Sequence, residues 1–508
     1  MLQDILSIIS SGGPLPFVAT GLALVVTWGF YTTKVHSLSK FPGPLGASLS
    51  RLWIFLHVLT GKAEKRERRL HEKYGPIVRI APDELSISDP QAMKIIYGTN
   101  TGFTKTDFYT VWKPTFVRHP DHFASLDEKV HSERRKIVNP VYSMSSIVES
   151  EEYIDKCVAL FLEQLDGFAD RKEVLDFSTW ARLYAFDVIG ELYFSNMFGF
   201  MKNQGDVDDY IYSLDTLVPI MALASIMPVY TRPLFLYGGA LFFPSIKRGL
   251  KSLAAIDREA GSCVEERLQS ERGGKPQRRD ILRKLFEIWE TSGVASDFEQ
   301  IDIKAEIYSA LLAGSDTTAT ALSSTMHYLV KDRRVYAKLT EEIDEETQKG
   351  NLSPGNIRYS EATKLQYLCA CVKEGMRMNP SVSFTLPRHV PKEGCEMAGF
   401  WIPGGTKVGM NAAVLHFDKG VFGEDAAEYR PERWLEPGAE TMNRYMLHFG
   451  GGSRTCLGKN ISMCEMYKLI PQMLRKFHLE PKNPTEDLKT SNFWFNKTIG
   501  VGIQAHRR

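Results

Sequence analysis

The chain is poor in cysteine. Only seven of its 508 residues are cysteines, an odd number, and no two of them form a C-x-x-C pair. A disulfide framework or a structural zinc site normally needs closely spaced or paired cysteines, so this composition argues against both. A reducing compartment is expected, in which any special cysteine acts alone.

The chain also lacks an excess of charge of either sign. Lys and Arg number 62 and Asp and Glu number 61, which leaves a formal charge of +1. A chain so balanced has no overall attraction to nucleic acid, and we expect no nucleic-acid partner. Apolar residues are 43% and charged residues 24%, as in ordinary globular proteins. This composition excludes a disordered chain, and the shortage of long uncharged runs excludes a multi-span transporter.

One long apolar run stands near the N-terminus. No side chain between Asp4 and Lys34 is charged, and the most apolar part is Leu15–Thr33. A helix of about 20 residues rises about 30 Å, enough to cross a bilayer core, and the positive charges that follow predict a cytosolic C-terminal side. We predict that residues 1–40 are a single-pass anchor and linker in the endoplasmic reticulum membrane. A cleaved signal peptide is the alternative, but the segment lacks a basic start and an A-x-A-like cleavage site.

Residues 41–508 are predicted to form one large domain, because no repeat and no long low-complexity linker interrupts them. The predicted fold class is mainly α with a small β-sheet region. Helical spacing of polar and apolar residues occurs over Lys62–Tyr74, Val130–Val138, Glu151–Ala169, Trp180–Leu192, Ile246–Ser270, Ile301–Lys331 and Arg333–Lys349. Strand-like composition occurs over Ile77–Ile80, Leu85–Ser88, Val382–Leu386 and Thr406–Met410.

Two apolar segments within residues 217–244 allow two interpretations. Leu217–Tyr230 and Pro233–Pro244 are both interrupted by helix breakers before they reach the length of a membrane span. They either belong to the buried core, or they form a lid that touches the membrane surface and covers an apolar entrance. Periodicity does not separate these two possibilities.

The segment FGGGSRTCLG at residues 449–458 carries the most specific pattern of the chain. Its glycines allow close approach of the backbone to another group, or positive φ angles. Backbone N–H groups in such a turn can stabilise the thiolate of Cys456 and tune its electron donation to a metal. By itself, a buried cysteine in a glycine turn would be the ordinary explanation. The remaining motifs of the chain favour a metal ligand.

The pattern F-x-x-G-x-R-x-C-x-G closely resembles the haem-binding loop of the cytochrome P-450 superfamily of haem-thiolate monooxygenases. The other motifs follow in the expected order over essentially the whole chain, and the layout looks like filamentous-fungal microsomal members of the pisatin-demethylase-like kind. The resemblance implies the cytochrome P-450 fold in residues 41–508 and haem b as cofactor. It implies that Cys456 is the axial ligand of the haem iron, that Phe449 packs beside the sulfur, and that Arg454 pairs with a haem propionate.

A second motif is Glu374-Gly-Met-Arg377, whose spacing places both charges on one helix face. Such pairs are common and usually solvated. However, the segment Pro431–Trp434 (PERW) follows and resembles an element of the same family. The resemblance implies that Glu374, Arg377 and Arg433 form a buried charge network that holds the haem loop in place, a structural rather than a chemical role.

The helix expected over Ile301–Lys331 contains AGSDTT at residues 313–318 in its middle. Small residues at 313 and 314 are expected to let a ligand approach the helix axis. In isolation, the favoured interpretation is that Thr317 bonds back to a backbone carbonyl. The string resembles the oxygen-activating signature of the family, which implies that Asp316 and Thr317 deliver protons during catalysis.

Three further residues are predicted to hold haem propionates by the same resemblance. His131 and Arg135 are four residues apart and share a helix face, where family members usually carry W-x-x-x-R, and Arg388 matches a second propionate-binding arginine. Arg134, Lys136 and Lys459 are either simply solvated or form a basic patch on which an acidic redox partner docks.

The substrate side is expected to be apolar. The segment Phe103–Phe123 is rich in aromatic residues, and in the family such a loop lies over the haem, with Ser381–Thr385 and Phe493–Phe495 also at the pocket. An apolar lining with a few hydroxyls suits a lipophilic small molecule.

The resulting hypothesis is a membrane-anchored haem-thiolate monooxygenase with a cytosolic catalytic domain. It would use O₂ to hydroxylate or epoxidise a lipophilic compound, with a terpenoid or polyketide of fungal secondary metabolism as the expected substrate. Electrons would come from NADPH through NADPH-cytochrome reductase, since the chain has no apparent G-x-G-x-x-G nucleotide-binding segment. A haem-thiolate isomerase or dehydratase that needs no reductase, and a non-enzymatic haem sensor, remain as alternatives.

Overall fold

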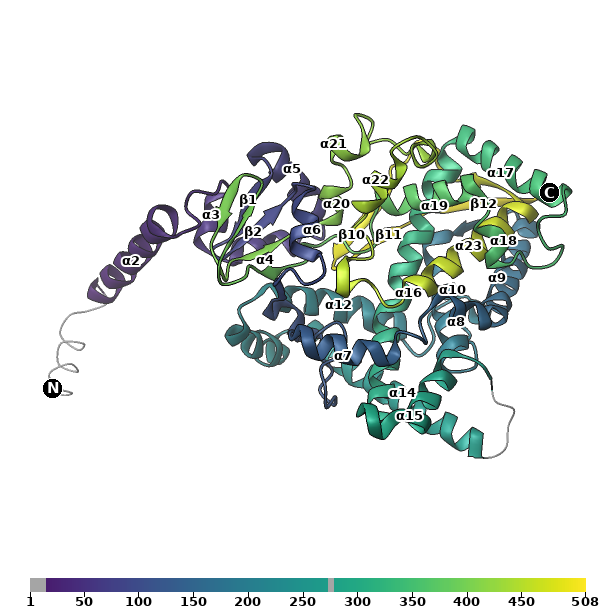
Figure 1. The fold of residues 1–508 in the computed structure, drawn as a ribbon, viewed down its shortest axis with the longest axis horizontal. Coiled ribbons are helices and arrows are strands. Elements are labelled where there is room, and N and C mark those ends of the chain that lie inside the picture. Colours follow the sequence, from purple (N-terminus) through teal and green to yellow (C-terminus); the bar gives the residue numbers. More distant parts are fainter. Residues whose placement is uncertain (1–14, 273–277) are drawn as a thin grey trace.

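Helices form most of the protein, which confirms the predicted mainly α architecture. The computed structural model describes residues 15–272 and 278–508. Each predicted long helix forms, with ends close to those predicted (Figure 1). The long helices are α5 (Ala63–Tyr74), α7 (Glu128–Val138), α9 (Glu151–Arg171), α10 (Phe177–Tyr193), α12 (Tyr210–Ile226), α14 (Pro244–Arg272), α15 (Ile281–Ser296), α16 (Gln300–Lys331), α17 (Arg333–Gln348), α19 (Gln366–Met378) and α23 (Lys459–Lys476).

Shorter helices connect these elements. The α-helical ones are α3 (Leu45–Leu49), α4 (Leu52–Val58), α6 (Ala92–Tyr97), α8 (Met144–Glu149), α11 (Phe200–Asn203), α13 (Gly239–Phe242), α18 (Tyr359–Ala362), α20 (Ala412–Leu415), α21 (Lys419–Phe422) and α22 (Ala439–Arg444). The remaining turns used below are the 3₁₀ segments η2 (Asp107–Trp112) and η5 (Pro431–Trp434) and the π-helical segments η1 (Tyr31–Val35) and η4 (Leu234–Gly238).

The strands form small sheets. A five-stranded sheet has the order β1-β2-β8-β5-β3, with β1 (Ile77–Ala81), β2 (Glu84–Ile87), β3 (Thr104–Lys105), β5 (Arg388–His389) and β8 (Lys407–Gly409). A three-stranded sheet has the order β4-β12-β9, with β4 (Val174–Asp176), β9 (Phe477–Pro481) and β12 (Gly502–Arg507). Two hairpins complete the set: β6 (Cys395–Met397) with β7 (Phe400–Ile402), and β10 (Lys489–Phe493) with β11 (Phe495–Ile499).

Three of the four predicted strands are present, and the prediction of a strand over Val382–Leu386 is wrong. This segment makes only an isolated bridge, between Val382 and Phe495. Its Ser383 carbonyl accepts hydrogen bonds from the side chains of Asn411 (3.1 Å) and Asn492 (2.7 Å). Side-chain amides thus bind a backbone group that would otherwise join a strand ladder.

Helix α16 runs through the middle of the body and packs against α10, α14 and α19 (Figure 1). Glycines permit the closest of these contacts. A Cβ at Gly375 of α19 would lie 2.3 Å from the Thr325 hydroxyl, and a Cβ at Gly314 of α16 would lie 2.4 Å from the Ile189 side chain of α10. The prediction that Gly314 opens space for a ligand is therefore wrong, because its missing side chain makes room for α10.

The N-terminal helix α2 (Leu15–Phe30) extends away from the body (Figure 1). It has 16 residues, a rise of about 24 Å, and the chain continues as η1, where Arg79 donates to the Thr32 carbonyl at 2.8 Å. Within residues 15–272 and 278–508, no helix is long and apolar enough to cross a membrane. The predicted spanning helix is thus not supported, and residues 1–14 of the predicted anchor lie outside the described residues.

The two apolar segments within residues 217–244 have different environments. In α12, Leu217–Ile226 is buried and belongs to the main hydrophobic core. The second segment lies at the surface, where η4, α13 and the adjoining Phe243 expose the side chains of Leu234, Tyr237, Leu241, Phe242 and Phe243. The core interpretation is thus confirmed for the first segment, and the membrane-touching lid stays a prediction for the second.

The carboxylate of Glu374 is the centre of a fully buried charge network. Arg377 donates to both of its oxygens at 2.8 Å. Arg433 Nε donates to Oε1 at 2.9 Å, and the Trp434 indole N–H donates to Oε2 at 2.9 Å. The backbone N–H of Arg430 completes the set at 3.0 Å. The predicted network of Glu374, Arg377 and Arg433 is confirmed.

This network connects to the loop before Cys456 through His416. Arg377 Nη1 donates to the His416 carbonyl at 2.8 Å, and His416 Nδ1 lies 3.2 Å from the Arg377 carbonyl. His416 Nε2 accepts the backbone N–H of Leu447 at 2.9 Å. Burial lowers the pKa of His416 well below its ordinary value, so the ring is neutral and Nδ1 donates. A neutral histidine thus holds the start of the loop against α19.

We expect Glu374→Ala to be destabilised by about 3–5 kcal/mol, because the substitution strands two buried guanidinium groups. Urea unfolding followed by circular dichroism measures this loss, and haem absorbance should be missing from the purified protein. Glu346→Ala is a matched control, since Glu346 pairs with Lys349 at the same i,i+3 spacing on an exposed helix face. The control should keep the wild-type midpoint. A stable Glu374→Ala protein with a normal Soret band would contradict the prediction.

Candidate functional site

The loop before α23 presents the side chain of Cys456. The Cys456 N–H donates to the Phe449 carbonyl at 2.8 Å, which closes the loop. Gly450 and Gly452 have φ angles of 71° and 57°, in the region that favours glycine. A Cβ at Gly452 would lie 2.1 Å from the Tyr97 carbonyl, so the loop also needs glycine for its close approach to α6.

Cys456 differs from most cysteines of the chain in its surroundings. Its side chain is exposed, whereas Cys157, Cys263, Cys371 and Cys464 are buried. Desolvation of the sulfur raises the pKa of Cys456, but hydrogen bonds from the Gly458 and Lys459 N–H groups and the charge of Arg135 oppose that effect. These amides lie at the start of α23 and point at the sulfur, as a thiolate ligand requires.

Three cationic side chains gather beside the five-stranded sheet. Strands β3 and β5 place Lys105 and Arg388 opposite each other, and both are buried. Arg388 donates to the Tyr109 hydroxyl at 2.6 Å, and Lys105 donates to the Phe123 carbonyl at 2.5 Å. Arg454 lies near them and pairs with Glu128 at 2.7 Å. The predicted contact of Arg454 with a propionate stays a prediction.

Lys105 was not among the residues predicted from the sequence. Burial, together with the charges of Arg388 and Arg454, lowers the pKa of Lys105 well below its ordinary value. Among the described residues, no carboxylate lies within ion-pair distance of Lys105 or Arg388. Because like charges disfavour one another in a buried site, this arrangement favours binding of a negatively charged group.

Helix α7 places His131 and Arg135 on one face, as their spacing predicts. His131 is 1% exposed, and within the described part of the chain neither of its ring nitrogens has a hydrogen-bond partner. Burial and the nearby Arg454 lower the pKa of His131 to about 2, so the ring is neutral. Arg135 donates to Asn139 at 3.2 Å, and the Cys456 sulfur partly offsets the effect of burial on its pKa.

These groups fit a haem. An unpartnered neutral histidine and two buried cations without carboxylate partners are suited to two propionates. An exposed cysteine with two amide donors is suited to an iron ligand. The residues that would bind the group are Cys456, Arg135, His131, Lys105 and Arg388.

Asp316 is not a free acid. Its Oδ1 lies 2.6 Å from Arg182 Nε on α10, and its Oδ2 lies 2.7 Å from Lys497 Nζ on β11. Both cations also pair with Asp215 on α12, at 2.8 Å and 2.5 Å. The four side chains form a balanced charge network that ties the middle of α16 to three other elements. Sequence analysis did not identify Arg182, Lys497 or Asp215, because they are distant from Asp316 in the chain.

Thr317 makes the local contact that its residue type favours. Its hydroxyl donates to the Ala313 carbonyl one turn earlier at 2.8 Å. Its own carbonyl accepts the Ser381 hydroxyl at 2.7 Å. Ala313 is exposed although α16 is otherwise largely buried, so the protein does not cover the helix at this point. The role of Thr317 in proton delivery stays a prediction.

The three segments predicted to line a substrate pocket meet in space. Phe108 of η2 contacts Phe384 and Trp494, with ring centroids 6.5 Å and 5.4 Å apart. Trp494 stands between β10 and β11 with a φ angle of 81°, a conformation that a bulky residue rarely adopts. Trp112 and Phe123 pack around the same indole. The hairpin of β10 and β11 thus also supplies part of the predicted pocket lining.

A partly open hollow adjoins this aromatic cluster. Its wall includes Phe108, Phe384 and Thr385 from the cluster side, and Trp53 and His57 of α4 from the other side. Burial lowers the pKa of His57 to about 4, so its ring is neutral. The hollow is suited to an apolar molecule that carries few hydrogen-bonding groups.

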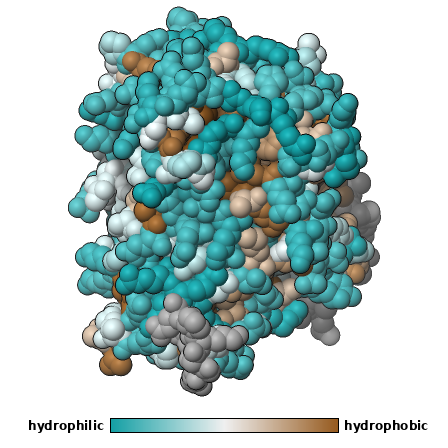
Figure 2. Space-filling view, turned by 90° about the vertical axis from the view of Figure 1, so that its right-hand side faces the viewer, coloured by the Kyte–Doolittle hydropathy of each residue, from teal (hydrophilic) through white to brown (hydrophobic). Residues whose placement is uncertain are grey.

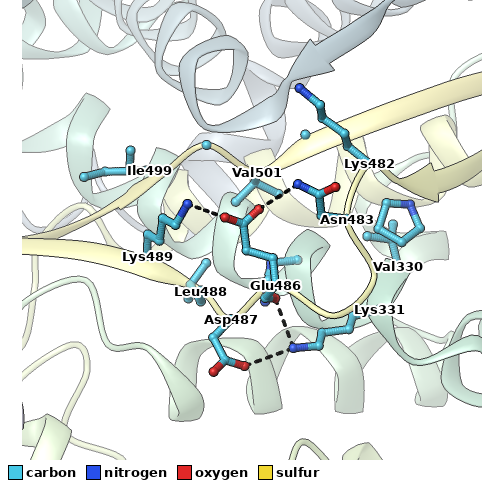
Figure 3. A pocket seen from close by; sticks show the side chains of 14 residues that line it. Val330, Lys331, Lys482, Asn483, Glu486, Asp487, Leu488, Lys489, Ile499 and Val501 are labelled. Atoms are coloured by element: carbon cyan, nitrogen blue, oxygen red, sulfur yellow. Dashed lines mark hydrogen bonds and ion pairs between the residues drawn. The ribbon is translucent and has the colours of Figure 1, made fainter.

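A second hollow lies near the C-terminal end of α16 and does not belong to this site. Figure 3 shows that most of its charged side chains face one another. Lys331 Nζ lies 3.0 Å from the Glu486 carbonyl and 3.1 Å from Asp487, and Glu486 also pairs with Lys489. Lys331, Glu486, Asp487 and Lys489 are thus paired within the hollow, while Lys482 points away from them.

Of the three residues considered for a basic patch, Arg134 is not available. It pairs with Asp302 of α16 at 2.8 Å and is largely covered. Lys136 and Lys459 are exposed. Any patch on this face therefore has at most two of the three cations.

The sequence of this chain is similar to those of known proteins over most of its length. The sequence profile of the cytochrome P-450 family matches residues 43–503. The cytochrome P-450 monooxygenase gsfF of Penicillium aethiopicum is 41% identical over 483 residues, which are 94% of this chain and 95% of the relative. Cytochrome P-450 monooxygenase cicH of Emericella nidulans is 36% identical over 93% of this chain and 94% of the relative. A pisatin demethylase of Fusarium vanettenii is 32% identical over 94% of this chain and 92% of the relative. The predicted family and the oxidoreductase class are confirmed.

We expect Lys105→Met to weaken haem retention by about tenfold to a hundredfold, the value of a hydrogen bond to a charged group. The rate of haem transfer to apomyoglobin measures this effect. The haem-free chain should unfold at the same or a higher temperature, because a buried cation without a carboxylate partner has been removed. Lys113→Met, at an exposed lysine of the same segment, is the control. Wild-type haem retention in Lys105→Met would contradict the assignment.

Proposed function

The chain belongs to the cytochrome P-450 family, and we propose that it hydroxylates or epoxidises a lipophilic small molecule of fungal secondary metabolism. The observation that supports this proposal most is the donor set around Cys456, an amide-supported sulfur beside a cluster of buried cations. Haem b, when bound there, would supply the activation of O₂. NADPH-cytochrome reductase is the proposed electron donor.

In this proposal the residues of the chain bind, orient and move protons. Cys456 ligates the iron, and Lys105, Arg388, Arg135 and His131 hold the propionates. Phe449 closes the loop beside the sulfur through its carbonyl and limits the access of water. Release of the Thr317 hydroxyl from the Ala313 carbonyl would free it to pass a proton, because a hydroxyl both donates and accepts.

Asp316 would contribute to proton delivery through its charge network. While Arg182 and Lys497 hold its carboxylate, it has no proton to give. We propose that a rearrangement of these pairs lets Asp316 orient the proton path to Thr317. Asp215 offers the same two cations a second carboxylate, but the buried Asp316 must gain another donor or a proton when they leave, since an unpaired buried charge is strongly destabilising.

The lining of the pocket supports a lipophilic substrate. The aromatic cluster is apolar, and the hollow beside it combines apolar side chains with the polar groups of Glu67 and Glu84. The hollow adjoins α4, whose Leu52, Leu56 and neighbouring Leu59 are exposed. An apolar compound could pass from such a surface to the apolar part of the hollow. A terpenoid or a polyketide has the required character.

We also propose that the protein resides at the endoplasmic reticulum membrane with its catalytic domain in the cytosol. Helix α2 exposes Phe17, Val18, Leu22 and Val25, and η4 and α13 expose further apolar side chains. The end of the body remote from α2 is largely hydrophilic (Figure 2). Apolar side chains exposed at particular elements favour contact with lipid through those elements.

The proposed activity is tested by two measurements on the full chain produced with a reductase. The reduced protein with carbon monoxide should show the absorption of thiolate-ligated haem, and product from an apolar substrate panel should require NADPH and O₂. Product formed without NADPH would favour an isomerase or dehydratase. An absorption maximum typical of histidine-ligated haem would contradict the role of Cys456.

We expect Thr317→Ala to divert NADPH consumption from product to hydrogen peroxide, because the variant lacks the hydroxyl that passes the proton. The ratio of product to NADPH consumed should fall several-fold while substrate binding, measured by spin-state titration, is unchanged. Thr317→Ser, which keeps the hydroxyl, is the matched control and should retain most of the coupling. Full coupling in Thr317→Ala would exclude the assigned role.

A further inference from the structure

A buried carboxylate on α16, Glu306, has no role in the motifs described above. It lies ten residues before Asp316, about 15 Å along the helix axis, and is 8% exposed. Its Oε1 lies 2.8 Å from His122 Nε2, and its Oε2 accepts the Tyr142 hydroxyl at 2.8 Å. Both partners come from connecting segments next to α7, so Glu306 joins these segments to α16.

Through His122, Glu306 reaches the cation cluster. The carbonyl of His122 accepts Arg454 at 3.4 Å, and the carbonyl of the next residue, Phe123, accepts Lys105 at 2.5 Å. Asp121 holds this turn by accepting the N–H groups of Phe123 (2.8 Å) and Ala124 (2.6 Å). Two backbone carbonyls of one short turn thus orient two of the three buried cations, and the His122 side chain attaches that turn to α16.

Through Tyr142, Glu306 reaches the helix that follows Cys456. The Tyr142 carbonyl accepts the side-chain amide of Asn460, in the first turn of α23, at 2.8 Å. Tyr193 of α10 donates to the Tyr142 hydroxyl at 3.1 Å. Glu306 is therefore connected both to the turn that binds Lys105 and Arg454 and to the helix that follows Cys456.

Glu306 carries its charge in this environment. Burial disfavours the ionised form, but His122, Tyr142 and the nearby Arg134 outweigh burial and lower the pKa of Glu306. Arg134 itself is bound to Asp302 at 2.8 Å. A negative charge in a partly dry site acts over a longer distance than one at the surface, because less water screens it.

We propose that Glu306 is a positioning residue for the haem, which fixes the turn at residues 121–124 and sets the electrostatic potential at the iron. This inference rests on the proposed haem site. The Glu306 side chain would then determine the positions of Lys105 and Arg454 and would also contribute to the reduction potential of the iron. The charge at Glu306 opposes the addition of an electron to the iron, so its removal makes reduction easier.

The test is Glu306→Gln in the haem-loaded full chain. Glutamine keeps the shape and a carbonyl acceptor and removes the charge. We expect a more positive reduction potential in spectroelectrochemical titration, and haem transfer to apomyoglobin that is several-fold faster than in the wild type. Wild-type values for both quantities would overturn the proposal.

Asp302→Asn is the matched control. Asp302 is also a buried acid near the start of α16, but it pairs with Arg118 (3.0 Å) and Arg134 (2.8 Å) and not with the turn at 121–124. Its haem transfer should stay at the wild-type value, and its change in potential should be smaller than that of Glu306→Gln. Equal shifts in both variants would overturn the specific role of Glu306, since any buried acid on this helix would then suffice.

Tyr142→Phe keeps the test decisive if Glu306→Gln does not accumulate. This variant retains the Glu306 charge and removes one hydrogen bond that disperses it, so its potential should shift in the negative direction. An unchanged or positive shift would overturn the proposal. A wild-type protein that binds no haem, by contrast, would refute the proposed function itself, which separates the two failures.

Discussion

The buried carboxylate of Glu374 is the interaction on which the arrangement of the site depends. Five donors converge on its two oxygens, from α19, from η5 and from the backbone beside η5. A charge so deep in the protein is tolerated only when every oxygen has donors, since an unpaired buried charge is strongly destabilising. Arg377 extends the network to His416, and His416 binds the Leu447 N–H at 2.9 Å. The loop that presents Cys456 is therefore held in place by a charge network that takes no part in the chemistry.

The cations near the site belong to two groups that differ in their partners. Arg182 and Lys497 share two carboxylates, Asp316 and Asp215, so their charges are balanced within the protein. Within residues 15–272 and 278–508, Lys105 donates to a backbone carbonyl and Arg388 to a hydroxyl and to the adjacent Pro387 carbonyl, and neither has a carboxylate partner. A group of buried cations left in this state favours an anionic ligand, and the haem propionates supply the matching charge. Among the described residues, Asp316 is likewise held by ion pairs, whereas the ring nitrogens of His131 have no hydrogen-bond partner.

The apolar segments also differ from one another, in that some are buried and some are exposed. Leu217–Ile226 completes the core against α14, while the following segment and α2 expose large apolar side chains. Both segments have similar composition, and only the packing of α12 against its neighbours distinguishes them. The exposed apolar surface of α4 lies next to the hollow that adjoins the aromatic cluster. An apolar substrate and an apolar surrounding medium would thus contact neighbouring elements of the protein.

The sequence by itself determined the family, the long helices, the Cys456 loop and the Glu374 network, because each depends on local spacing or on a motif within a few residues. It did not determine the roles of Lys105, His416 or Glu306, nor the ion pairs of Asp316 and the contact of Arg454 with Glu128. These depend on residues far apart in the chain, such as Lys105 opposite Arg388 or His122 beside Glu306. The strand predicted over Val382–Leu386 failed for the same reason, since Asn411 and Asn492 bind its Ser383 carbonyl from elsewhere in the fold. Local pattern determined which elements form, and tertiary packing decided which charges are compensated and which remain for a ligand.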